Sequence, residues 1–120
     1  MLVGRLIIVL LVAVVQTKLY QVVSLFRHGA RYHINSYYDG NSTKEVWGEL
    51  TAVGMRQHET LGKMLRKEYI DKLNFIGSTY KHGEIEIYTT DVNRTFQSVI
   101  SQLYGLYPLG TGSRMPFVDK

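Results

Sequence analysis

A histidine stands between two arginines near the start of the chain, in the stretch SLFRHGARYH at residues 24–33. Arginine keeps its charge at physiological pH, and its planar guanidinium group presents donors that match the oxygens of phosphate or carboxylate. An imidazole beside such groups can attack an electrophilic atom that the arginines hold in place. Arg27, His28 and Arg31 are therefore predicted to form an oxyanion site with His28 as the nucleophile. Gly29 is expected to allow a close approach between backbone and ligand.

A fourth candidate lies at a second predicted junction between a strand and a helix. Asp91 is expected at or near the N-cap of this helix, and Arg94 in its first turn. A cation in the first turn opposes the helix macrodipole, whereas a bound anion would remove that conflict. We therefore expect Arg94 to join Arg27 and Arg31 on one phosphate group.

The other histidines are assigned structural roles. His58 falls on an apolar helical stripe, which predicts a core histidine that makes a hydrogen bond. His82 precedes Gly83 in a predicted turn. A lone histidine at the end of a strand is most often a satisfied polar residue, so it is the flanking arginines that favour a functional His28. No pair of histidines has metal-ligand spacing with a carboxylate, so a zinc or iron site is not expected. No cofactor is predicted.

The first elements that would position these side chains are a strand and a helix. Residues 20–26 are dense in β-branched and aromatic side chains, which predicts a strand buried on both faces. A polar loop follows at residues 30–49. Thr51 can cap a helix that runs to about Tyr69. The charged side chains expected on its outward face are Arg56, Lys63, Arg66 and Lys67.

The second half of the chain repeats this order. Residues 84–88 alternate in polarity as a strand does, and the next helix is expected to stop at Gly105. The order strand, loop, helix, strand, helix predicts an α/β fold with a parallel-type sheet and helices packed on it. Ligands of such sheets bind outside the carboxyl ends of the strands, where the arginines would stand. The apolar residues that recur at helical spacing in the second helix are Val92, Phe96, Val99 and Leu103.

Residues 1–17 have the layout of a secretory signal peptide. Arg5 precedes an uninterrupted apolar run at residues 6–15, which is too short to span a bilayer as a helix. The domain at residues 18–120 is therefore expected in the secreted space or in a lysosomal or vacuolar lumen, with no membrane association after cleavage.

Composition excludes one class of partner. The chain has 14 basic and 10 acidic side chains, and its basic residues form no run that could track a phosphate backbone. Nucleic acid is therefore not an expected partner. Asn41 starts a glycosylation sequon in the polar loop. Asn93 starts a second sequon, which we expect to be unmodified because a glycan there would block the predicted site.

Three blocks of the sequence closely resemble the histidine acid phosphatases, and they read LFRHGARYH, ELTAVGMRQHETLGKMLRKEYI and IYTTDVNRTFQSVISQLYGLYP. The resemblance implies a sheet with helices on both faces beside a helical lid, of which this chain holds the N-terminal portion. It also implies a phosphate monoester as substrate and no metal. By the same resemblance, His28 is the nucleophile that becomes phosphohistidine, and the residues of the phosphate clamp are Arg27, Arg31 and Arg94.

The sequence departs from the family pattern in two places. His33 stands where the family usually has proline, and the chain contains no His-Asp dipeptide, which in the family supplies the proton to the leaving group. One alternative is therefore a fragment or pseudoenzyme that at most binds phosphate. A mutase of the superfamily's other branch fits less well, because Ala30 stands where that branch typically has glutamate. A homodimer is left open.

Overall fold

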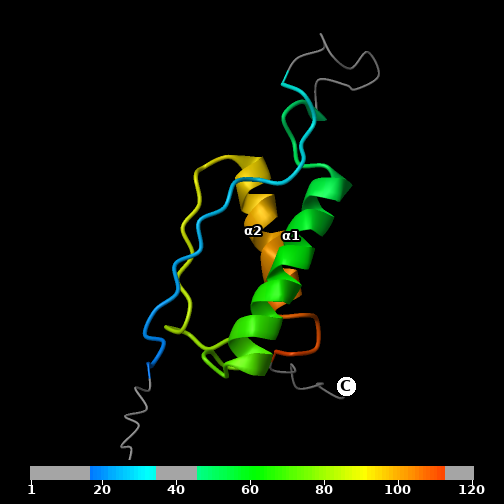
Figure 1. Cartoon of the computed structure of the whole chain (residues 1–120). Coiled ribbons are helices and arrows are strands. Elements are labelled where there is room, and N and C mark those ends of the chain that lie inside the picture. The colour runs from blue at the N-terminus through cyan, green and yellow to red at the C-terminus, as the bar shows by residue number, and fades with distance from the viewer. Residues whose placement is uncertain (1–16, 35–45, 113–120) are drawn as a thin grey trace, which may run out of the picture.

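The computed structural model describes residues 17–34 and 46–112, and helices dominate this part of the chain. The helices are α1 (Ala52–Leu65), the π-helix η2 (Arg66–Lys72) that continues it, and α2 (Asn93–Leu106). Figure 1 shows α1 and α2 lying alongside each other with their N-terminal ends at the same end of the pair. No helix within the described ranges is long and apolar enough to cross a membrane.

Helix α1 begins where the sequence predicts. The Thr51 side chain accepts a hydrogen bond from the Gly54 N–H at 3.1 Å, which satisfies one of the free donors of the first turn. The helical path continues to Lys72 rather than ending near Tyr69, because the last turns widen to the π pattern. Asn74, with a φ of 47°, then turns the chain away.

The two α-helices pack through small residues. Gly62 and Gly105 face each other across the interface, and a Cβ on either glycine would overlap backbone atoms of the other helix. His58 is buried in the same interface, with its Nδ1 3.4 Å from Oε1 of Gln102. Its ring lies 5.3 Å from that of Phe26, measured between centroids. The prediction of a hydrogen-bonded core histidine is confirmed.

The predicted details of α2 are partly confirmed and need two corrections. Asp91 lies next to the N-cap residue Val92, as predicted, and the N-cap makes no side-chain hydrogen bond. Gly105 lies inside the helix rather than at its stop, because it provides the space in which α1 packs. Phe96 is 55% exposed, although its spacing predicted a place on the buried stripe. The close approach of α1 selects a face of small residues, so Phe96 turns outward while Val99 and Leu106 are buried.

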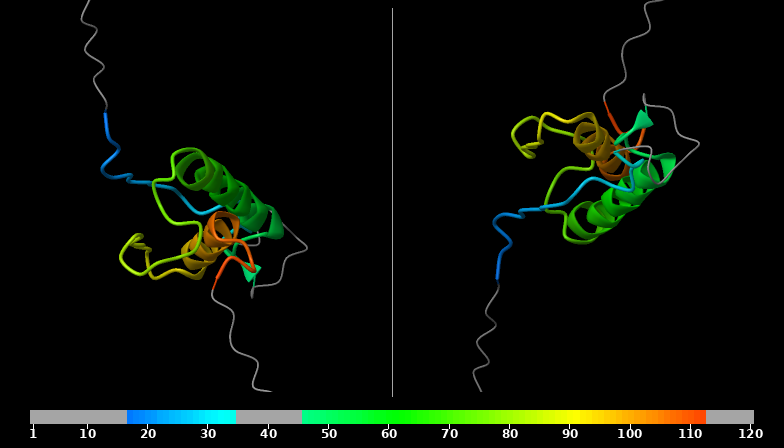
Figure 2. Two further views of the ribbon diagram at one scale, coloured as in Figure 1. Left: turned by 90° about the horizontal axis from the view of Figure 1, so that it is seen from below. Right: turned by 90° about the horizontal axis from the view of Figure 1, so that it is seen from above.

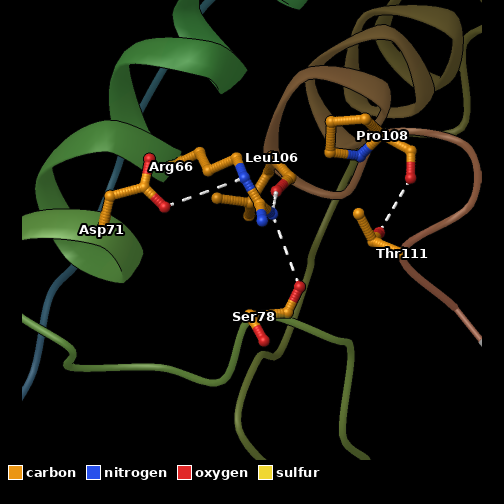
Figure 3. A network of polar contacts seen from close by, with 6 residues as sticks. All are labelled: Arg66, Asp71, Ser78, Leu106, Pro108 and Thr111. Atoms are coloured by element: carbon orange, nitrogen blue, oxygen red, sulfur yellow. Dashed lines mark hydrogen bonds and ion pairs between the residues drawn. The ribbon is translucent and has the colours of Figure 1, made fainter.

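Arg66 is not on the outward face where the sequence places it. Its side chain is 22% exposed, and Nη1 donates to the Leu106 carbonyl at 2.8 Å and to the Ser78 carbonyl at 3.4 Å. Nε lies 4.0 Å from the Asp71 carboxylate (Figure 3). A guanidinium group at the last carbonyls of α2 satisfies acceptors that have no partner inside the helix. This network stands at the opposite end of the helix pair from the helix N-termini.

The two predicted strands are not formed. Residues 20–26 and 84–88 have no strand assignment, and the one β-bridge among the described residues joins Arg31 to Leu50 in antiparallel orientation. Val23 is 82% exposed and Leu25 is 98% exposed, so the first segment is not buried on both faces. Both segments lie on the same side of the helix pair (Figures 1 and 2). A strand needs a hydrogen-bonded neighbour, and neither segment has a backbone ladder with one here.

Residues 1–16 of the predicted leader and the sequon at Asn41 lie outside the described residues.

Candidate active site

Three of the four predicted site residues line one open hollow. Arg27, His28 and Arg31 border a space of about 430 Å³ together with other residues of the same loop and with Gln57 of α1. The full lining consists of Arg27, His28, Gly29, Ala30, Arg31, His33 and Gln57. Two guanidinium groups and no carboxylate border this space, which suits it to an anion.

Both helices hold the backbone of this loop. The Ala30 N–H donates to Oε1 of Gln57 on α1 at 2.9 Å, and the Gly29 N–H donates to Oγ of Ser98 on α2 at 3.2 Å. The Ala30 carbonyl accepts from both the N–H and the hydroxyl of Thr51, each at 2.9 Å. In Figure 1 the loop passes across the helix pair near the N-terminal ends of both helices. The loop therefore rests where helix N–H groups and dipoles favour negative charge.

A short antiparallel pairing fixes the loop beyond Ala30. The Tyr32 N–H donates to the Glu49 carbonyl at 2.8 Å, and the Gly48 N–H donates to the His33 carbonyl at 2.9 Å. Between the Tyr32–Glu49 bond and the bond from the Thr51 N–H to the Ala30 carbonyl, the bridge to Leu50 holds Arg31 just ahead of α1. This pairing sets the position of Arg31.

Packing against α1 leaves no room for a side chain at Gly29. A Cβ at this position would stand 2.5 Å from the Gly54 carbonyl oxygen and 2.7 Å from the Gly54 Cα, both in the first turn of α1. Gly54 in turn lies against the backbone of Ala30. The sequence predicts glycine here for the approach of a ligand, but the contact in the structure is an approach of two backbone segments.

The ring of His28 is oriented by the backbone of its own loop. Its Nδ1 lies 2.8 Å from the Gly29 carbonyl oxygen. A carbonyl can only accept a hydrogen bond, so Nδ1 carries the proton of the neutral ring. The Nε2 atom then holds the lone pair, which is the form a nucleophile needs. The side chain is half-buried at the wall of the hollow.

Arg94 does not line the hollow. It lies in the first turn of α2, as predicted, and a Cβ at Gly48 would stand 3.8 Å from its Nη1. Its Nε is buried and has no hydrogen-bond partner among the described residues. Arg94 therefore stands beside the turn that pairs with His33, a residue of the hollow's lining.

The neighbour of Arg94 in sequence is occupied by a polar contact. The Asn93 side-chain amide donates to the Glu49 carboxylate. This contact engages the nitrogen that a glycan would use, in line with the expectation that this sequon stays unmodified, which remains a prediction. In the described ranges, no group of three histidine, aspartate or glutamate side chains could hold a metal ion.

Sequence reasoning missed two residues that hold the site together, Gln57 and Ser98. Ser98 lies four residues after Arg94, and so one turn further along the same face of the helix. Gln57 lies three residues after Gly54 on α1. A search for polar side chains one turn from a proposed ligand or from a close-packed glycine could have found both.

Comparison with known proteins identifies similar sequences. The family model of the histidine phosphatase superfamily (branch 2) matches residues 34–119, a range that contains Arg94 and starts after the cluster of Arg27, His28 and Arg31. Prostatic acid phosphatase of Mus musculus is 41% identical over 91 residues, which cover 72% of this chain and 23% of the relative. Lysosomal acid phosphatase of Xenopus laevis is 40% identical over 91 residues, covering 72% and 20%.

Prostatic acid phosphatase of Homo sapiens is 37% identical over 91 residues, which cover 72% of this chain and 23% of that protein. The resemblance inferred from the sequence is confirmed at the level of the family. The chain spans less than a quarter of the length of these curated relatives.

Proposed function

The chain belongs to the histidine phosphatase superfamily (branch 2), and we propose that it forms part of an acid phosphatase that hydrolyses phosphate monoesters through a phosphohistidine at His28. One observation carries the proposal most directly. The Nδ1 of His28 is held 2.8 Å from the Gly29 carbonyl, which leaves Nε2 free to attack. Arg27 and Arg31 line the same hollow and would bind the oxygens of the phosphoryl group.

The proposed reaction has two steps. Nε2 of His28 attacks phosphorus, a P–N bond forms, and the P–O bond to the alcohol breaks with its electron pair on the leaving oxygen. Water then attacks phosphorus, the P–N bond breaks, and inorganic phosphate leaves with the imidazole restored. Arg27 and Arg31 stabilise the charge that spreads over the transferring oxygens. An alkoxide that leaves in the first step needs a proton, whereas a weakly basic leaving group such as 4-nitrophenolate does not.

Arg94 is proposed as the third member of the phosphate clamp. Its buried Nε without a partner among the described residues supports this role, because a buried donor is costly to leave unpaired. The Gly48 turn beside it pairs with His33, which lines the hollow. A ligand oxygen on this side of the hollow would satisfy the Nε of Arg94.

The same proposal includes a β-sheet in the complete domain and a cellular compartment in which it works. Residues 20–26 and 84–88 would supply strands of a parallel-type sheet with helices on both faces. The domain at residues 18–120 would work in the secreted space or in a lysosomal lumen after loss of a signal peptide. Two of the similar proteins carry the names prostatic and lysosomal acid phosphatase, which supports this setting.

Titration of the chain with orthophosphate and with vanadate, followed by NMR, tests the site. Arg27→Ala, Arg31→Ala and Arg94→Ala should each weaken binding by about tenfold, as loss of a charge-assisted hydrogen bond predicts. Arg56→Ala is the matched control, because Arg56 is exposed on α1 and does not line the hollow. Absence of saturable binding, or an equal loss in the Arg56 variant, would overturn the assignment. A chain that binds phosphate but forms no covalent phosphohistidine at His28 would support the alternative, in which the chain binds phosphate without hydrolysing it.

A further inference from the structure

One buried hydroxyl connects the loop of His28 to the helix of Arg94. Ser98 is 1% exposed and is the most deeply buried polar side chain in the described part of the chain. Its Oγ lies 2.7 Å from the Arg94 carbonyl, one turn earlier in α2, and 3.2 Å from the Gly29 nitrogen, 69 residues away in sequence. These contacts bring the two halves of the proposed clamp into one network.

The direction of each hydrogen bond in this network is fixed. A backbone N–H can only donate and a carbonyl can only accept, so Ser98 accepts from Gly29 and gives its single proton to Arg94. Gly29 is thereby bonded at both of its backbone groups. Its N–H is held by Ser98, and its carbonyl accepts from Nδ1 of His28.

We propose that Ser98 is a positioning residue: it fixes the Gly29 peptide, and through it the ring of His28, relative to the first turn of α2 that carries Arg94. The inference rests on the proposed function for its consequence in phosphate binding, but the connection itself can be tested independently. Ser98 touches neither the hollow nor a reacting atom, so its effect reaches the ligand through Gly29.

The packing around Gly29 makes this connection specific. On its α1 side the loop is already in contact with Gly54, so the loop has no room to move toward α1. On the α2 side the hydroxyl of Ser98 is the contact that holds it. Without this hydroxyl the Gly29 N–H loses its partner, and the loop is free to move away from α2.

The same helix offers a matched control. Ser101 is also buried, and its Oγ donates to the Gln97 carbonyl one turn earlier at 2.7 Å, the same bond that Ser98 makes to Arg94. Within the described part of the chain, Ser101 makes no hydrogen bond to the loop of His28. Ser98→Ala and Ser101→Ala therefore remove the same hydroxyl and the same helical bond, and differ in the contact with Gly29.

The experiment compares these two variants of the chain by two NMR measurements. The first is the hydrogen-exchange rate of the Gly29 amide, which Ser98→Ala should raise by about tenfold or more and Ser101→Ala should leave unchanged. The second is the dissociation constant for orthophosphate, which Ser98→Ala should raise by about tenfold and Ser101→Ala by less than about twofold. If Ser98→Ala does not fold, Ser98→Cys takes its place. Its side chain is similar in size but its sulfur accepts hydrogen bonds weakly, so this variant should also raise the exchange rate of the Gly29 amide.

Equal exchange rates of the Gly29 amide in the Ser98 and Ser101 variants would overturn the positioning role, whether or not phosphate binds. Wild-type chain that binds no phosphate would instead refute the proposed function, and the exchange measurement would still decide the role of Ser98. Faster exchange with unchanged phosphate affinity would show a structural contact without consequence for the site, which also contradicts the proposal.

Discussion

Two regions of this chain are rich in apolar residues, and they behave differently. In the α1–α2 interface, Gly62 and Gly105 let the helices approach until backbone meets backbone, and Leu106 is buried beside them. In the extended segment at residues 20–26, Leu25 is 98% exposed. A helix makes its own backbone hydrogen bonds, whereas an extended segment is stable as a strand only beside a partner. The proposed site lies where these two regions meet.

The largest effect is expected from filling the helix interface. Gly62→Ala places a methyl group on the backbone of Gln102, which cannot move aside as a flexible side chain could. We expect a loss of about 3 kcal/mol in the free energy of unfolding, measured by urea unfolding. Gly112→Ala is the control, because its added Cβ comes within 4 Å of no atom of the described residues apart from its chain neighbours. Equal stability of the two variants would mean that the close approach of the helices is not present in solution.

An intermediate effect is expected from the same substitution made in each region. Leu106→Ala removes a buried side chain and should lower the free energy of unfolding by about 2 to 4 kcal/mol, whereas Leu25→Ala should change it by less than about 0.5 kcal/mol. Thermal or urea unfolding of both variants measures the difference. A large loss from Leu25→Ala would show that the extended segment is packed in solution, and would favour the sheet over the open arrangement.

The smallest effect concerns two tyrosines, one at the end of the helix pair and one in the second extended segment at residues 84–88. Burial raises the pKa of Tyr107 at the end of α2, while a hydrogen bond to Glu86 raises the pKa of Tyr88 in residues 84–88. Glu86→Ala should therefore lower the pKa of Tyr88 and leave that of Tyr107 unchanged, as NMR titration of the rings would show. Because folding raises the pKa of each tyrosine, each contributes to the free energy of unfolding below the ordinary tyrosine pKa. This contribution is lost as pH rises through the folded-state pKa. A shift at Tyr107 in this variant would contradict the separation of residues 84–88 from the end of α2.

The sequence correctly predicts those features of the fold that depend on residues close together in the chain. The cap at Thr51, the core position of His58 and the first-turn position of Arg94 each depend on residues within one or two turns. Arg27, His28 and Arg31 are neighbours in sequence, so their meeting in one hollow required only a short loop.

The errors arise where a distant partner decides the outcome. The two predicted strands depend on neighbours that the alternating pattern does not identify. Arg66 and Ser98 look like ordinary surface and helix residues until α1, α2 and the loop are assembled. Gly105 has the sequence position of a helix stop, but its role is to admit α1. The catalytic and phosphate-binding roles of the site residues remain predictions.

The most direct test of the central claim is covalent labelling of the chain with ³²P-labelled 4-nitrophenyl phosphate, whose leaving group needs no proton. Quenching in alkali preserves phosphohistidine, and cleavage after Arg27 and Arg31 releases His28 in a peptide that lacks His33. The account predicts label on this peptide, lost in His28→Ala and retained in His33→Ala, which changes another residue of the same hollow. Label that persists in His28→Ala, or that is never found on the peptide of His28, would contradict the assignment of the nucleophile.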